Sequence, residues 1–82
     1  MNPDDNLIRM ANQIGVFFES MPDRAEGLEG IATHIRKFWD PRMRQALLAA
    51  IDGGHAEGLR PIVADAVQAH RPQIQPQPAD QA

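Results

Sequence analysis

Helix-ending residues divide this chain of 82 residues into four short segments. Met21-Pro22 and Asp40-Pro41 each place a residue before proline, a position that disfavours helical backbone. Gly53-Gly54 supplies the glycine that commonly adopts the left-handed conformation after a helix. Pro61 is compatible only with the first turn of a helix. The chain is therefore restricted to short elements, which have to pack on one another to bury a core.

Each segment carries one apolar stripe with the period of an α-helix. The stripes are Leu7, Met10, Ala11, Ile14 and Phe18, widened by Phe17; Leu28, Ile31, Ala32, Ile35 and Trp39; Met43, Ala46, Leu47, Ala50 and Ile51; and Leu59, Ile62, Val63, Ala66 and Val67. No segment alternates with the period of a β-strand. The sequence predicts an all-α fold, a small bundle of three to four short helices over residues 5–20, 23–39, 41–52 and 59–69.

Two acidic residues are predicted to cap helices. Asp23 precedes the second segment, and Asp40 precedes Pro41, which is favoured at the first helical position. Gly27 and Gly30 lie on adjacent turns of the second segment. Glycine weakens a helix by about 1 kcal/mol relative to alanine, so this pair indicates close approach of a neighbouring helix.

The C-terminal residues 71–82 differ from the rest of the chain in composition. They read RPQIQPQPADQA, with Ile74 as the single large apolar residue among prolines and glutamines. Such a segment buries too little apolar surface to offset the entropy of ordering it. We expect a helical domain over residues 1–70 and a disordered tail over residues 71–82.

Composition excludes several classes of function. A chain this short buries only roughly 60% of its unfolded surface, and it has no cysteine for disulfides, thiolate zinc sites or iron–sulfur clusters. His34, His55 and His70 are too far apart in sequence to suggest a metal site. No nucleophile motif or phosphate-binding loop is present. We therefore expect that this chain is not an enzyme and binds no cofactor. We also expect that a partner protein supplies part of its stability, and that the isolated chain is partly molten or self-associating.

Charge and hydropathy restrict the kind of partner. The net charge is −3, in contrast to the basic excess of most nucleic-acid-binding domains. No apolar run has the length of a membrane span or of a signal-peptide core. We expect a cytoplasmic protein that contacts neither nucleic acid nor membrane.

The segment HIRKFWDPRMR, residues 34–44, is the unusual feature of the chain. Its candidate partner-contact residues are Arg36, Lys37, Phe38, Trp39, Arg42 and Arg44. Three interpretations stay open. Trp and Arg are enriched in protein interfaces, which predicts a partner contact anchored by Trp39. The segment also fits a solvated helix face beside a core tryptophan, or a single-strand site that combines stacking with phosphate contacts.

Three stretches resemble the delta subunit of NAD-dependent formate dehydrogenase. They are MANQIGVFFES (10–20), HIRKFWDPRMRQALLAAID (34–52) and GLRPIVADAV (58–67). They follow in order with compatible spacing, and RKFWDPRMR is a rare string. The linker GGHAEG is longer than the turn expected for the family, and the tail lies outside the resemblance.

The resemblance implies a noncatalytic accessory subunit of a cytoplasmic enzyme complex that oxidises formate to carbon dioxide. Such a complex uses a molybdenum or tungsten pterin, iron–sulfur clusters, FMN and NAD, none of which the resemblance places on this chain. The implied partner is the large catalytic (alpha) subunit, which this chain would bind and stabilise. The alternatives are a transient assembly chaperone for cofactor insertion and a small nucleic-acid or regulatory binding module.

Overall fold

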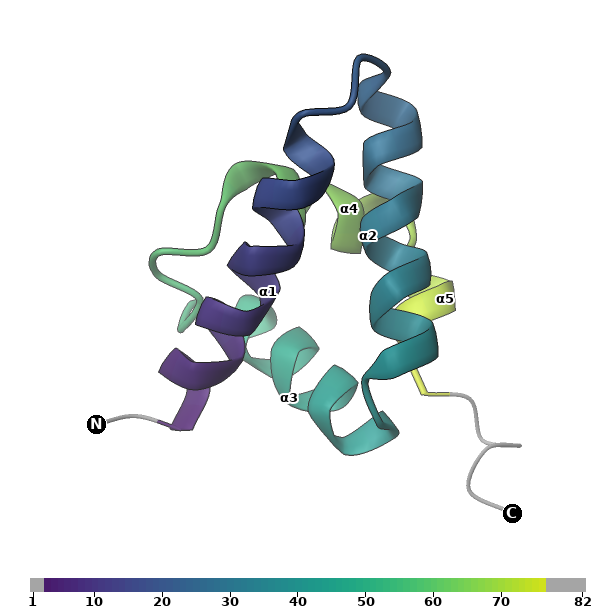
Figure 1. The fold of residues 1–82 in the computed structure, drawn as a ribbon. Coiled ribbons are helices and arrows are strands. Elements are labelled where there is room, and N and C mark those ends of the chain that lie inside the picture. The colour runs from purple at the N-terminus through teal and green to yellow at the C-terminus, as the bar shows by residue number, and fades with distance from the viewer. Residues whose placement is uncertain (1–2, 77–82) are drawn as a thin grey trace.

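The structure is a computed structural model that describes residues 3–76, and these residues form helices without any strand (Figure 1). The helices are α1 (Pro3–Glu19), α2 (Arg24–Phe38), α3 (Pro41–Asp52), α4 (Pro61–Ala69) and α5 (Arg71–Ile74). In Figure 1, α1 and α2 form the two legs of an inverted V, α3 crosses its open end, and α4 and α5 lie behind. The predicted all-α bundle is confirmed.

The helix boundaries follow the capping chemistry expected from the sequence. Asp23 Oδ1 accepts a hydrogen bond from the amide of Ala25 at 2.9 Å, and Asp40 Oδ1 accepts one from the amide of Met43 at 2.8 Å. Pro41 and Pro61 stand in the first turns of α3 and α4. Both positions suit proline, because an N–H in the first turn has no partner within the helix.

Five boundaries differ from the sequence prediction by one or two residues. α1 runs over Pro3–Glu19 instead of 5–20, α2 runs over Arg24–Phe38 instead of 23–39, and α4 begins at Pro61 instead of residue 59. After α3, Gly53 has a φ of −87° and Gly54 has a φ of 74°. The left-handed residue predicted from the glycine pair is therefore Gly54.

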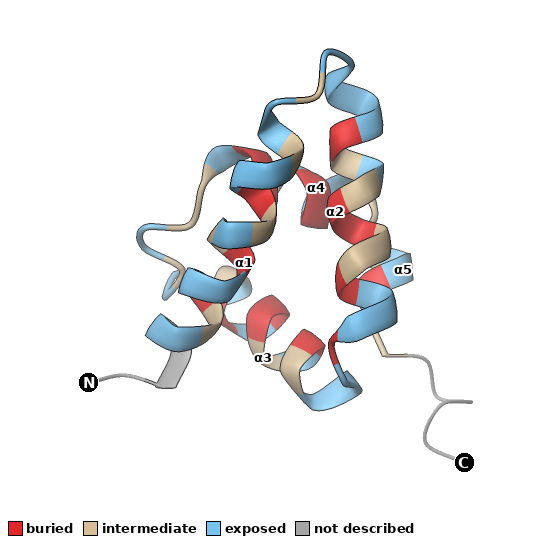
Figure 2. Ribbon diagram, viewed as in Figure 1, coloured by how far each residue is buried: buried red, intermediate tan, exposed pale blue. Residues whose placement is uncertain are grey.

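The core lies where α2 meets α4, and α1, α3 and α5 close it. Figure 2 shows buried residues on the sides of the helices that face the centre of the molecule. The largest completely buried side chains are Ile31, Ile35, Leu47, Val63, Val67 and Ile74. Five of these six belong to the predicted stripes, and Ile74 does not.

The C-terminal segment corrects the prediction of a tail that is disordered from residue 71. Residues 71–74 form α5, and Ile74 is completely buried. Arg71 binds Asp52 through two hydrogen bonds, Nη2–Oδ2 at 2.5 Å and Nη1–Oδ1 at 3.0 Å. These bonds hold the pKa of the Asp52 carboxyl below its ordinary value. The buried side chain of Ile74 and the bidentate ion pair of Arg71 hold this polar segment against the helical bundle. Residues 77–82 of the predicted tail lie outside the described residues.

The tight end of the V depends on glycine. A Cβ added at Gly30 would collide with the ring of Phe18, and one added at Gly27 would lie 3.0 Å from the Phe18 carbonyl oxygen. The predicted close approach at these two glycines is confirmed, and its neighbour is the end of α1. From this close approach, α1 and α2 diverge toward α3 (Figure 1).

Candidate partner-binding site

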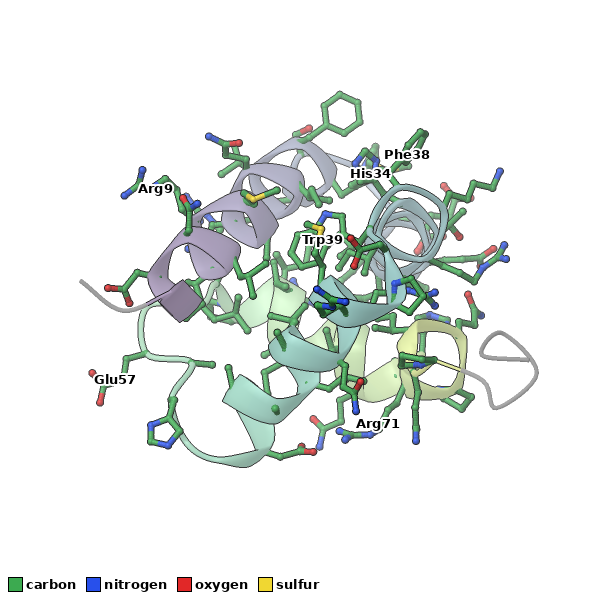
Figure 3. The ribbon with its side chains drawn as sticks, turned by 90° about the horizontal axis from the view of Figure 1, so that it is seen from below. Arg9, His34, Phe38, Trp39, Glu57 and Arg71 are labelled. Atoms are coloured by element: carbon green, nitrogen blue, oxygen red, sulfur yellow. The ribbon has the colours of Figure 1, made fainter. Side chains whose placement is uncertain are left out.

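The six residues predicted as a partner contact differ in their exposure to solvent. Arg36, Lys37, Phe38 and Arg42 are exposed, whereas Trp39 and Arg44 are only 5% and 7% exposed. Trp39 follows the last residue of α2 with extended backbone, φ −94° and ψ 133°, and its ring belongs to the core cluster. Figure 3 shows Phe38 on the outer side of α2 and Trp39 between the helices. This burial does not fit the prediction that Trp39 projects from the surface as the anchor of a partner contact.

Arg44 has an internal role instead of the predicted pairing with acidic groups of a partner. Its Nη1 donates a hydrogen bond to the carbonyl oxygen of Ile74 at 3.3 Å. Ile74 is the last residue of α5, so the guanidinium lies at the negative end of this helix turn. The Nε atom of Arg44 is buried without a hydrogen-bond partner in the described structure. Arg44 therefore connects α3 to α5.

Exposed cations remain at the α2–α3 corner. Three arginines elsewhere in residues 3–76 form ion pairs, Arg24 with Asp65, Arg60 with Glu19, and Arg71 with Asp52. Within the same range, Arg36, Lys37 and Arg42 form none. Their charges are directed to solvent and are available to an acidic surface.

An apolar hollow of about 540 Å³ lies between the legs of the V. It is lined by Met10, Gln13, Ile14, Phe17, Phe18, His34 and Trp39. The α1 residues among them recur every three or four positions, so they form one face of that helix. Trp39 is thus a core residue whose remaining exposed edge lines the hollow.

A second hollow of about 610 Å³ adjoins the first and follows the outer side of α2. The two hollows share Phe18 and His34 as lining residues. The second hollow is lined further by Met21, Glu26, Glu29, Gly30, Thr33, Lys37 and Phe38. We call the two together the α1–α2 trough.

Aromatic rings stand at the rim of the α1–α2 trough. Phe17 is 69% exposed and Phe38 is 71% exposed. The Phe17 ring packs edge-on against Phe18 with centroids 4.9 Å apart. The Phe38 ring lies beside the imidazole of His34 (Figure 3), with centroids 4.7 Å apart. Two neighbouring phenyl-lined helices with exposed rings are unusual on a small protein surface and are typical of binding sites.

Sequence reasoning missed the part of the trough that α1 contributes. Met10 belongs to the predicted apolar stripe, which Phe17 widens, yet Met10 is 37% exposed and Phe17 is 69% exposed. The available signal was the breadth of the apolar face. Ile8 and Ala11 face the core, while Met10 and Phe17 face the trough. A helix that is apolar on more than one side is usually covered on more than one side.

Two further features concern residues 3–76 as a whole. No helix in this range is long and apolar enough to cross a membrane. No group of three or more His, Asp or Glu side chains in it is placed to hold a metal ion. His34, His55 and His70 lie on α2, on the loop after α3 and at the junction of α4 with α5.

Comparison with known proteins identifies a family that this chain resembles. The family model of the NADH-dependent formate dehydrogenase delta subunit FdsD matches residues 6–67, well over half of the chain. This range includes most of α1, all of α2 and α3, and most of α4. No match was found among curated proteins or among solved structures.

Proposed function

The chain belongs to the NADH-dependent formate dehydrogenase delta subunit family, and we propose that it is a noncatalytic accessory subunit of that enzyme. In this proposal it binds and stabilises the large catalytic subunit in the cytoplasm. The observation that carries the proposal is the α1–α2 trough, an apolar surface with exposed phenyl rings beside unpaired cations. A surface of this kind fits a protein interface better than any catalytic role.

The cofactors of the complex are assigned to other subunits. Iron–sulfur clusters are held by cysteine thiolates, and this chain has no cysteine. The donor set therefore does not fit a cluster, and no redox step is attributed to this chain. The proposal leaves the choice of molybdenum or tungsten to the catalytic subunit.

The burial of Trp39 disfavours the nucleic-acid alternative. Single-strand binding by stacking would use Phe38 and Trp39 as adjacent platforms. Only Phe38 presents its ring to solvent, because Trp39 is 5% exposed. Among the three functions considered, the assembly chaperone remains the closest rival, since it would use the same apolar surface.

Copurification at two stages of maturation tests the proposal. The large subunit is tagged and isolated together with this chain, once from cells that supply the pterin cofactor and once from cells that cannot make it. A permanent subunit is expected in equal amount with the mature enzyme. It should also slow thermal inactivation of that enzyme. Association only with the cofactor-free form would indicate a chaperone, and no association at either stage would refute both.

A further inference from the structure

α1 and α2 use one side of the V for the core and leave the other side open. α4 packs on both helices from behind, and α3 packs on α1. No helix of residues 3–76 covers Phe17 or Phe38, which are about two-thirds exposed or more. The open side nevertheless has the apolar residues of a buried face. A further element is therefore missing from the packing of α1 and α2.

The shape of the trough is suited to a helix. Two diverging helices form a groove into which the side chains of a third helix can pack. The backbone amides of α1 and α2 are already used within their helices, so an extended peptide would find no strand to join here. A second copy of this chain would present the same hollow, and two facing hollows enclose a void that close packing disfavours.

Charges along α2 give the trough a direction. Glu26 and Glu29 lie toward its first turns, and Lys37 lies in its last turn, all beside the second hollow. All three are exposed and form no ion pair within residues 3–76. Glu26 and Lys37 are separated by about 16 Å at 1.5 Å per residue, roughly three helical turns. Arg42 adds a second unpaired cation beyond the Lys37 end.

We propose that the α1–α2 trough binds one amphipathic helix of the large subunit, oriented by this charge gradient. The apolar face of that helix lies between Phe17 and Phe38. Its acidic side chains lie at the Lys37 end and its basic side chains at the Glu26 end, about three turns apart on one face. The inference rests on the proposed function for the identity of the partner, and it adds the surface, the kind of element and its direction.

The first test removes the two rim rings from the full chain. The double variant Phe17→Ala/Phe38→Ala is expected to weaken binding to the purified large subunit at least tenfold, because exposed aromatic residues that become buried dominate interface affinity. Helicity should be unchanged, since neither ring contributes to the core. Val16→Ala is the matched control: Val16 is also exposed, but it lines a different hollow and not the trough. Its affinity should equal that of the wild type.

The second test reverses charges at the two ends of the trough. Lys37→Glu and Glu29→Lys are each expected to lower the association rate roughly threefold or more at low salt, and the difference should shrink at high salt. The control is Arg9→Glu, because Arg9 is an exposed cation on α1 outside the trough (Figure 3). An equal effect of Arg9→Glu would show that only net charge matters and would overturn the proposed direction.

The third test identifies the bound element. Phe17 is replaced by the photoreactive p-benzoylphenylalanine in the assembled complex, and the crosslinked peptides are sequenced. They should fall within one amphipathic helix of the large subunit. Crosslinks to a second copy of this chain, or to several unrelated segments, would overturn the inference.

The outcomes separate this inference from the proposed function. If the wild-type chain binds the large subunit and the double variant binds equally well, the trough is not the contact, and the function stands. If the wild-type chain does not bind the large subunit, the proposed function itself fails.

Discussion

The two sides of the α1–α2 pair have similar residues and opposite surroundings. On the inner side, Ile31 and Ile35 are completely buried by α4 and its neighbours. On the outer side, Phe17 and Phe38 are 69% and 71% exposed. Large apolar side chains occur on both, so residue type alone does not separate them. The difference lies in what the rest of the chain covers. Under the proposal, the inner side serves folding and the outer side serves binding.

The largest effect is expected from a cavity on the inner side. Ile31→Ala should lower the free energy of unfolding by about 3–5 kcal/mol, because the packed neighbours relax only partly around the lost methyl groups. Urea denaturation followed by circular dichroism measures this change. For a chain of this size, a loss of that order removes a large part of the total stability. A loss below about 1 kcal/mol would contradict the assignment of this side as a well-packed core.

Ile74→Ala tests whether α5 belongs to the inner side. We expect a loss of about 2 kcal/mol, at the lower end for isoleucine, because a single terminal turn can shift to fill part of the cavity. Amide hydrogen exchange should show faster exchange in residues 71–76 of the variant. If stability and exchange are both unchanged, α5 does not contribute to the core in solution.

The outer side is expected to behave in the opposite way. Phe17→Ala should change the free energy of unfolding of the isolated chain by no more than about 0.5 kcal/mol, as is usual for exposed positions. Val16→Ala gives the reference for an exposed residue of the same helix. A much larger loss in Phe17→Ala than in Val16→Ala would mean that the trough is closed in solution and would remove the contrast between the two sides.

The smallest effect concerns the exposed ion pair that joins α3 to α5. The pKa of Asp52 is lowered by its hydrogen bonds to Arg71, so its contribution is present above the unfolded pKa and is lost as pH falls through the folded pKa. Asp52→Asn should therefore reduce the melting temperature slightly at pH 7, and the difference from the wild type should shrink as the pH is lowered to about 2, because the carboxyl group becomes protonated. The comparison of melting curves at these two pH values is the measurement. A difference that persists undiminished at the lower pH would point to a cause other than this charge.

Helix positions could be predicted from the sequence because their signals are local. The caps at Asp23 and Asp40 and the stops at proline depend on neighbouring residues alone, and the structure confirms them. The distribution of Trp39, Arg44 and Phe38 between interior and surface depends on which helices meet. Trp39 continues the stripe of Ile31 and Ile35, so its burial was within reach of the periodicity argument. Phe38 stands one position away and is directed outward.

Arg44 and Ile74 could not be assigned from local signals. Arginine is rarely buried, and an isolated isoleucine among prolines and glutamines is typical of a disordered segment. In the structure the two residues interact: the side chain of Ile74 is buried in the core, and its carbonyl oxygen accepts a hydrogen bond from the buried Arg44. Only the three-dimensional arrangement of α2, α3 and α5 brings these two residues together.

The burial of Ile74 shows that the folded unit extends beyond the region that the family model matches. The family match stops at residue 67, whereas the buried side chains continue to residue 74. A chain truncated at residue 67 would still match the family model, but it would lose Ile74, whose helix α5 packs on α2 and α4. It would expose apolar surface on its inner side as well as in the trough, so it would have two surfaces that promote aggregation. The family match therefore ends seven residues before Ile74, the last buried residue of the core.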